Sequence, residues 1–186
     1  YRALTLKALR LGVRLDDEQA LEALARVSVI DLACEPGKPL QVFIDGEDVS
    51  GAIRSLEVTN NTFYAARTPG VRHIMVEWQR LLGARRSMVS DGRDLGTVVF
   101  PGAKYKFYLD ADFDVRCRRR IDELKAKGVA VDEQALRQDV AERDHKDKTR
   151  SVGPLKPAEG AVIIDSTAMS IDAVVNVLYG YITENR

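Results

Sequence analysis

Residues 87–94 read Ser-Met-Val-Ser-Asp-Gly-Arg-Asp, a short apolar run that leads directly into a polar turn. We expect the first four residues to form a strand that ends in this turn, with Gly92 allowing a sharp bend. Asp91, Arg93 and Asp94 would then lie beyond its carboxyl end, where open α/β sheets bind ligands. An arginine fork suits phosphate oxygens, and a carboxylate suits an exocyclic amino group. The alternative is a structural turn with a local ion pair; this position in an α/β sheet favours a functional site.

Strands and helices alternate on the carboxyl-terminal side of this segment. Strands are expected at Lys104–Leu109 and Ala161–Asp165, and helices at Val115–Lys127, from Asp132 to about Asp147, and at Ile171–Tyr181. Gly128 is expected to end the first of these helices and Asp132 to cap the second. Such alternation is typical of a parallel α/β sheet.

The amino-terminal side combines helices with a small antiparallel insert. Helices are expected at Tyr1–Leu11, from Asp16 or Asp17 to about Ala25, and from about Glu57 to Leu82 with an interruption near Pro69-Gly70. Between them, strands are expected at Val29–Leu32 and Gln41–Ile44, with a short third strand at Val49–Ile53. Pro36 and Gly37 belong to the turn signal between the first two strands.

Composition limits the class of protein. The chain has 186 residues, of which 45% are hydrophobic and 30% charged, which fits one main domain with a substantial core. Its net charge of zero argues weakly against a general nucleic-acid or membrane-surface binder. No apolar run is long enough to span a bilayer. Cys34 and Cys117 are far apart and fit reduced thiols in a cytoplasmic protein, and no metal-ligand cluster is visible.

Two arginine-rich patterns allow more than one interpretation. Arg143, Asp147 and Arg150 are spaced i, i+4 and i+7, so a continuing helix would place them on one face that can hold a phosphate and a ribose diol. Taken alone, a solvated helix face with weak ion pairs is the better interpretation. The run Arg116, Arg118, Arg119 and Arg120 fits ATP phosphates, RNA backbone or plain surface, and composition alone favours surface.

Six segments make the chain resemble bacterial cytidylate (CMP) kinase along essentially its whole length. The most specific is Asp-Gly-Arg-Asp-x-Gly-Thr-Val-Val-Phe-Pro at 91–101. The others are Tyr1-Arg2-Ala3, Gly46-Glu47-Asp48-Val49, Glu142-Arg143-Asp144, Pro154-Leu155-Lys156-Pro157-Ala158 and Asp165-Ser166-Thr167. The resemblance implies a P-loop nucleoside-monophosphate kinase fold, with a parallel core sheet, a small antiparallel insert and a helical lid. It also implies phosphoryl transfer from ATP to CMP or dCMP, with Mg²⁺ accompanying the ATP.

The resemblance assigns roles to eight positions. Arg93, Arg150 and Arg119 would be catalytic, the first two as phosphate ligands and the third as a lid arginine near the triphosphate. Substrate-binding roles fall to Arg2 on phosphate, Arg72 and Asp94 on cytosine, Asp147 on the ribose hydroxyls, and Arg143 as the arginine neighbour of Asp147. The implied parts are a core of 1–25, 69–116 and 151–186, a monophosphate-binding insert at 26–68 and a lid at 117–150.

The chain departs from the family pattern at two points. No G-x-x-x-x-G-K-[ST] loop occurs in its 186 residues, so the P-loop and the first strand are absent. We therefore expect an N-terminal piece to be missing, no ATP cradle in this chain, two unpaired sheet edges, and no kinase activity of the chain alone. Phe63 stands where some relatives carry a small polar residue that contacts the base, and a phenyl ring cannot donate that hydrogen bond.

Three functions follow, in order of preference. The first is an ATP-dependent CMP/dCMP kinase whose partners are small nucleotides, with no nucleic acid or membrane involved, acting as a monomer. The second is a remnant that binds a pyrimidine monophosphate without transferring a phosphoryl group. The third, an RNA-binding domain, rests only on the arginine run and is opposed by the zero net charge.

Overall fold

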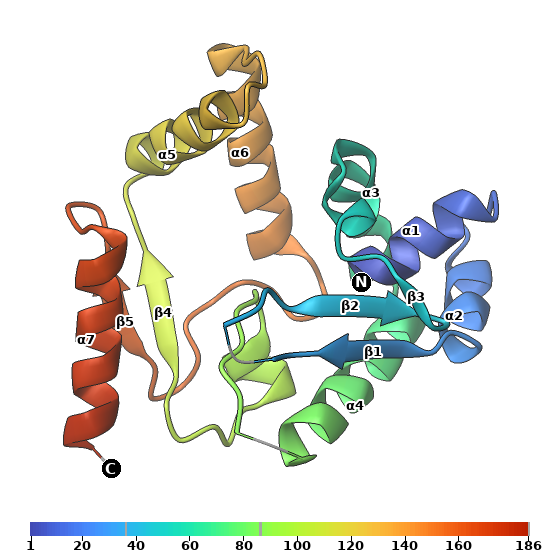
Figure 1. The fold of residues 1–186 in the computed structure, drawn as a ribbon, viewed down its shortest axis with the longest axis horizontal. Helices are drawn as coiled ribbons and strands as arrows, with labels where there is room; N and C mark the ends of the chain where they lie inside the picture. Colours follow the sequence, from blue (N-terminus) through green and yellow to red (C-terminus); the bar gives the residue numbers. More distant parts are fainter. Residues whose placement is uncertain (36, 86, 186) are drawn as a thin grey trace. The chain divides into compact units, whose positions relative to one another are not determined.

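The computed structural model describes residues 1–35, 37–85 and 87–185. The chain divides into two compact units, Tyr1–Met88 and Val89–Arg186 (Figure 1). Helices and both kinds of sheet are present, so the predicted α/β class is confirmed.

Four helices form most of the first unit: α1 (Arg2–Arg10), α2 (Glu18–Arg26), α3 (Leu56–Arg67) and α4 (Pro69–Arg85). Leu4, Leu21 and Val71 are fully buried where these helices meet. Two predicted helix boundaries are confirmed, the end of α1 and the start of α2. α1 ends just before Gly12, whose φ of 66° favours glycine, and the Asp17 side chain caps α2 by accepting from the Ala20 N–H.

The predicted insert is a three-stranded antiparallel sheet of β1 (Ile30–Ala33), β2 (Gln41–Ile44) and β3 (Glu47–Asp48). β1 and β2 pair from Ile30 opposite Ile44 to Ala33 opposite Gln41. The third strand was predicted too late in the chain, at Val49–Ile53. Val49 and Ile53 are buried against Ala3 of α1 and Ile44, with a 3₁₀ turn at Ala52–Arg54, because their apolar side chains serve the core rather than a strand. Pro36 of the predicted turn lies outside the described residues.

The second unit contains a parallel pair of strands, β4 (Phe107–Asp110) and β5 (Val162–Asp165), in register from Phe107 opposite Val162 to Asp110 opposite Asp165. Three helices accompany them: α5 (Phe113–Ala126), α6 (Glu133–Thr149) and α7 (Ile171–Glu184). α7 packs on the start of β4, where the rings of Phe107 and Tyr181 meet edge to face at 5.5 Å. α5 and α6 contact each other as a helical hairpin whose two helices cross rather than run alongside each other (Figure 1). The predicted helices are confirmed.

The expected strand at Ser87–Ser90 is wrong, because these residues adopt no regular structure and Val89 is fully exposed. A strand needs a hydrogen-bonded neighbour, and the ladders in the described part of the chain join only β1 with β2, β2 with β3, and β4 with β5. β4 and β5 are also less buried than their apolar sequences predicted, with Leu109 at 52% and Ile163 at 64% exposure.

None of the helices in residues 1–35, 37–85 and 87–185 combines the length and apolarity needed to cross a bilayer.

Candidate functional site

Asp94 is positioned by an unusual turn. Residues Leu95–Val99 form a single π-helical turn, in which the Asp94 carbonyl accepts from Val98 N–H at 2.8 Å. Such turns often occur at functional sites. Asp94 precedes the turn, but its carboxylate makes no capping hydrogen bond to it, so the side chain serves something else. Gly96 lets the turn pack closely, since a Cβ there would lie 2.9 Å from the Ala158 Cβ.

Gly92 has a different role from the predicted sharp bend. Its φ is not positive, so its backbone conformation is open to other residues. What a side chain would meet is Leu95, whose Cγ lies 3.0 Å from the place of a Cβ. Gly92 therefore leaves room for the first residue of the π-helical turn.

Two arginine–aspartate pairs join this loop to the end of α6. Arg93 Nε donates to Asp147 Oδ2 at 2.8 Å, and Arg150 Nη2 lies 3.6 Å from Asp94 Oδ1. The side chains of Asp94 and Arg150 are each only 12% exposed, whereas Arg93 is 44% exposed. The two partners of each pair are more than 50 positions apart in the sequence, and the structure brings them together.

Backbone contacts fix the end of α6 on which these pairs depend. Arg150 is the residue that ends the helix, and its Nε donates to the Gly153 carbonyl at 2.6 Å. The Leu155 N–H donates to the Asp147 carbonyl at 2.8 Å. Asp147 and Arg150 therefore lie at a defined helix terminus, whereas their spacing predicted one face of a continuing helix. Arg143, the third member of the predicted face, lies one turn earlier on α6 and is exposed.

Arg119 lies on α5 and reaches the loop that follows β5. Its guanidinium donates to the carbonyls of Ser166 at 2.7 Å, Met169 at 3.1 Å and Thr167 at 3.4 Å, and to the Ser166 hydroxyl at 3.3 Å. In the same loop the hydroxyl and backbone N–H of Thr167 hold the pKa of Asp165 below its usual value. Arg119 thus holds the loop against α5, and its contacts described here go to Ser166, Thr167 and Met169 rather than to the two arginine–aspartate pairs.

We expect Arg119→Ala to loosen this loop. Three carbonyls, of which that of Ser166 makes a partly buried bond, would lose a charged donor. Hydrogen bonds to charged groups contribute about 1.5–3 kcal/mol. Amide hydrogen exchange at 166–169 should speed up markedly, whereas Arg118→Ala, on the same helix, should leave it unchanged. Unchanged protection of the loop in Arg119→Ala would mean that these contacts do not hold it.

Arg2 and Arg72 belong to the first unit. Arg2 Nη1 donates to the Ile53 carbonyl at 2.7 Å and to Thr59 Oγ1 at 3.0 Å, tying α1 to α3. Arg72 is 3% exposed, donates to the Ala66 carbonyl at 3.1 Å and lies 5.9 Å from the centre of the Tyr1 ring. Phe63 on α3 packs edge to face on Tyr64 at 5.6 Å. These contacts are all within the protein, so the nucleotide roles of Arg2 and Arg72 stay predictions.

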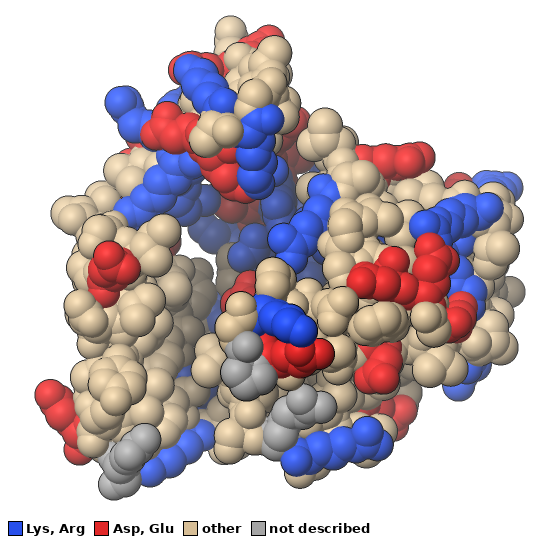
Figure 2. Space-filling view, viewed as in Figure 1, with Lys and Arg blue, Asp and Glu red and all other residues tan. Residues whose placement is uncertain are grey.

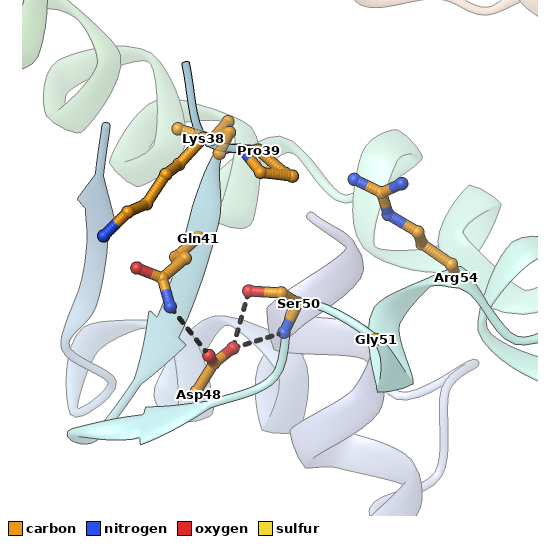
Figure 3. Close-up of a pocket in the computed structure, with 8 residues that line it drawn as sticks. Lys38, Pro39, Gln41, Asp48, Ser50, Gly51 and Arg54 are labelled. Atoms are coloured by element: carbon orange, nitrogen blue, oxygen red, sulfur yellow. Dashed lines mark hydrogen bonds between the residues drawn. The ribbon is translucent and has the colours of Figure 1, made fainter. Parts of the chain in front are cut away.

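A shallow hollow of about 440 Å³ lies on the antiparallel insert (Figure 3). Asp48 on one wall accepts hydrogen bonds from the Ser50 hydroxyl and the Gln41 amide, and Arg54 extends from the opposite side. Its lining residues include none of the eight predicted site residues. The candidate site is therefore defined by paired side chains rather than by this hollow.

The arginine run on α5 does not form a face of one sign. Arg120 pairs with Glu123, and Lys127 pairs with the same carboxylate. Lys and Arg side chains are interleaved with Asp and Glu over the upper part of the molecule, which carries α5 and α6 (Figure 2). A mixed surface of this kind gives little electrostatic support to binding of an RNA backbone.

Sequence reasoning missed one ion pair near this site. Arg116 Nη1 donates to Asp144 Oδ2 at 2.6 Å and so links α5 to α6. The two residues are 28 positions apart, and only the hairpin brings them together. Asp144 belongs to the family-like segment Glu142-Arg143-Asp144 and Arg116 to the arginine run, but nothing in either pattern indicated that the two residues pair.

Among the described residues, no group of three or more His, Cys, Asp or Glu side chains is arranged to hold a metal ion.

Comparison with known proteins points to one family. The family model described as cytidylate kinase matches residues 1–184. The cytidylate kinase of Desulforamulus reducens is 45% identical over 186 residues, which cover all of this chain and 83% of that protein. The one from Pelotomaculum thermopropionicum is 42% identical, covering all of this chain and 82% of that protein. The one from Listeria innocua is 44% identical over 176 residues, covering 95% of this chain and 78% of that protein.

Proposed function

Because the chain belongs to the cytidylate kinase family, we propose that the protein transfers the terminal phosphoryl group of ATP to CMP and dCMP. The observation that carries this proposal is the pairing of Arg93 with Asp147 and of Asp94 with Arg150. The two guanidinium groups offer positive charge to the phosphate of a nucleoside monophosphate. The two carboxylates offer acceptors to its hydroxyl and amino groups. Phosphoryl transfer requires positioning and charge neutralisation more than a covalent catalyst.

The proposed roles follow from the chemistry of each side chain. Arg93 and Arg150 bind phosphate oxygens, since guanidinium forks match them. Asp147 accepts from the ribose hydroxyls and Asp94 from the cytosine amino group. Each arginine already holds one of these carboxylates, so the nucleotide enters by exchange: its phosphate replaces a carboxylate on arginine, and its donors replace arginine on the carboxylate.

The remaining assignments are part of the same proposal. Arg2 binds phosphate, Arg72 contacts cytosine, Arg143 supports Asp147, and Arg119 approaches the triphosphate. Mg²⁺ enters as ATP–Mg²⁺, because phosphate oxygens are ligands that this ion prefers.

The test is a kinase assay on the complete product of the gene that encodes residues 1–186. ADP formation from ATP–Mg²⁺ is followed with CMP, dCMP, UMP or AMP as the acceptor, and binding of CMP is measured by calorimetry. We expect CMP and dCMP to be good acceptors and AMP a poor one. Equal use of AMP would defeat the cytidine assignment. Tight binding of CMP without formation of CDP would defeat the kinase assignment and identify a binding protein.

A further inference from the structure

The Arg116 guanidinium links three parts of the chain at the base of the α5–α6 hairpin. Asp112 caps α5 by accepting from the Asp114 N–H at 2.8 Å and the Val115 N–H at 3.2 Å. In the next turn, Arg116 Nε donates to the Ala111 carbonyl at 3.0 Å, and its Nη1 donates to Asp144 Oδ2 at 2.6 Å. A single side chain therefore connects the segment just after β4 with α6.

Asp144 lies three residues before Asp147 on α6, so the two carboxylates are surface neighbours on one side of the helix. Asp144 is held by Arg116, and Asp147 is held by Arg93. With 1.5 Å of rise and 100° of turn per residue, a rotation or slide of α6 that frees Asp144 also displaces Asp147. The Arg116–Asp144 pair thus fixes the rotation of α6 close to the candidate site.

This pair differs from the other ion pairs between the same two helices. The side chains of Arg116 and Asp144 are 33% and 26% exposed. Those of Arg137 and Asp114 are 44% and 69% exposed, and those of Lys125 and Glu133 are 55% and 56% exposed. Exposed pairs contribute little, whereas a partly desolvated pair with a second hydrogen bond to the backbone holds its geometry better. The two exposed pairs therefore serve as matched controls.

We propose that Arg116 and Asp144 are positioning residues of the phosphoryl-transfer site, which act by setting the rotation of α6 and so the place of Asp147. Neither residue touches the nucleotide. The proposal rests on the proposed function for the site that it serves, and it adds a role for two residues that the family resemblance did not assign.

The first measurement is independent of activity. In Asp144→Ala, we expect faster amide hydrogen exchange over residues 144–150 and at Leu155, whose N–H bonds the Asp147 carbonyl. Asp114→Ala and Glu133→Ala, which break the exposed pairs, should leave this protection unchanged. Unchanged protection in Asp144→Ala, or an equal effect in the two controls, would overturn the proposal whether or not the protein phosphorylates CMP.

The second measurement is a double-mutant cycle on kcat/KM for CMP. Asp144→Ala should lower kcat/KM by about three- to tenfold, since small displacements of positioning groups have large kinetic effects. If Asp144 acts through Asp147, the same change should have little further effect in an Asp147→Ala background. The loss should be smaller for 2′,3′-dideoxy-CMP, which lacks the ribose hydroxyls, and Asp144→Glu should restore part of the activity.

Additive losses in the cycle, or the same loss on CMP and its dideoxy analogue, would show that Asp144 does not act through Asp147. A wild-type protein that phosphorylates no CMP would instead defeat the proposed function. In that case the exchange measurement alone decides whether the pair fixes α6, so the two failures are distinguishable.

Discussion

Replacing Arg93 or Arg150 with alanine is expected to lower kcat/KM for CMP by about 10–100-fold. Each change removes a charge-assisted hydrogen bond to phosphate, which contributes on the order of 1.5–3 kcal/mol. Arg150→Ala should have the larger effect, because this side chain is only 12% exposed and its loss leaves the equally buried Asp94 without the 3.6 Å ion pair. The measurement is steady-state kinetics with CMP varied at saturating ATP.

Arg120→Ala is the matched control, since Arg120 is a partly exposed arginine on α5 whose described ion pair is local, with Glu123 one turn away. We expect it to retain near-normal kinetics. Near-normal kinetics in both Arg93→Ala and Arg150→Ala, with normal folding, would make these arginines ordinary surface and loop residues. The phosphate assignment would then fail.

The second expected result separates recognition of sugar from recognition of base. Asp147→Ala should reduce kcat/KM for CMP more than for 2′,3′-dideoxy-CMP, because the analogue has no hydroxyls to donate to this carboxylate. Asp94→Ala should reduce the difference in kcat/KM between CMP and UMP. UMP offers a carbonyl oxygen where CMP offers an amino group, and a carbonyl oxygen repels a carboxylate. A site built to satisfy one polar group rejects the analogue that leaves that group unpaired.

The measurement is a matrix of kcat/KM for the two variants against the three nucleotides. Glu142→Ala provides a control for loss of an acidic residue on α6, because its carboxylate is exposed and pairs with Lys146 one turn away. Equal losses on every nucleotide would contradict both assignments. The two aspartates would then serve mainly to hold Arg93 and Arg150, as they do in the structure without a nucleotide.

Local signals in the sequence were sufficient for the helices. Asp17 caps α2 and Gly12 follows α1 because capping and positive φ depend on residues within one turn. The strands were harder, because a strand depends on its neighbour. Ser87–Ser90 has a strand-like sequence but no regular structure, whereas the polar residues of β3, Glu47–Asp48, form a strand because β2 lies beside them.

In the candidate site, too, the sequence indicated local features but not the contacts between distant residues. The spacing of Arg143, Asp147 and Arg150 predicted one helix face if the helix continued, but α6 ends at Thr149 and Arg150 follows it in a non-helical conformation. Their partners, Arg93 and Asp94, are more than 50 residues away. The turn at 91–94 indicated these two residues, but nothing in the sequence indicated that they pair with Asp147 and Arg150. The role of Arg119 near the triphosphate stays a prediction. Its hydrogen bonds to the carbonyls of Ser166, Thr167 and Met169 depend on the fold, and no sequence pattern indicated them.

The internal pairing of Arg93 with Asp147 and of Arg150 with Asp94 also affects which anions the protein retains. Each arginine already has a counter-charge, so the four side chains sum to zero formal charge and attract a simple anion only weakly. Orthophosphate or sulfate can replace a carboxylate as the partner of arginine, but it gives that carboxylate no hydrogen-bond donor in exchange. A nucleotide supplies both the anion and the donors, so we expect it to compete well even where inorganic phosphate is abundant.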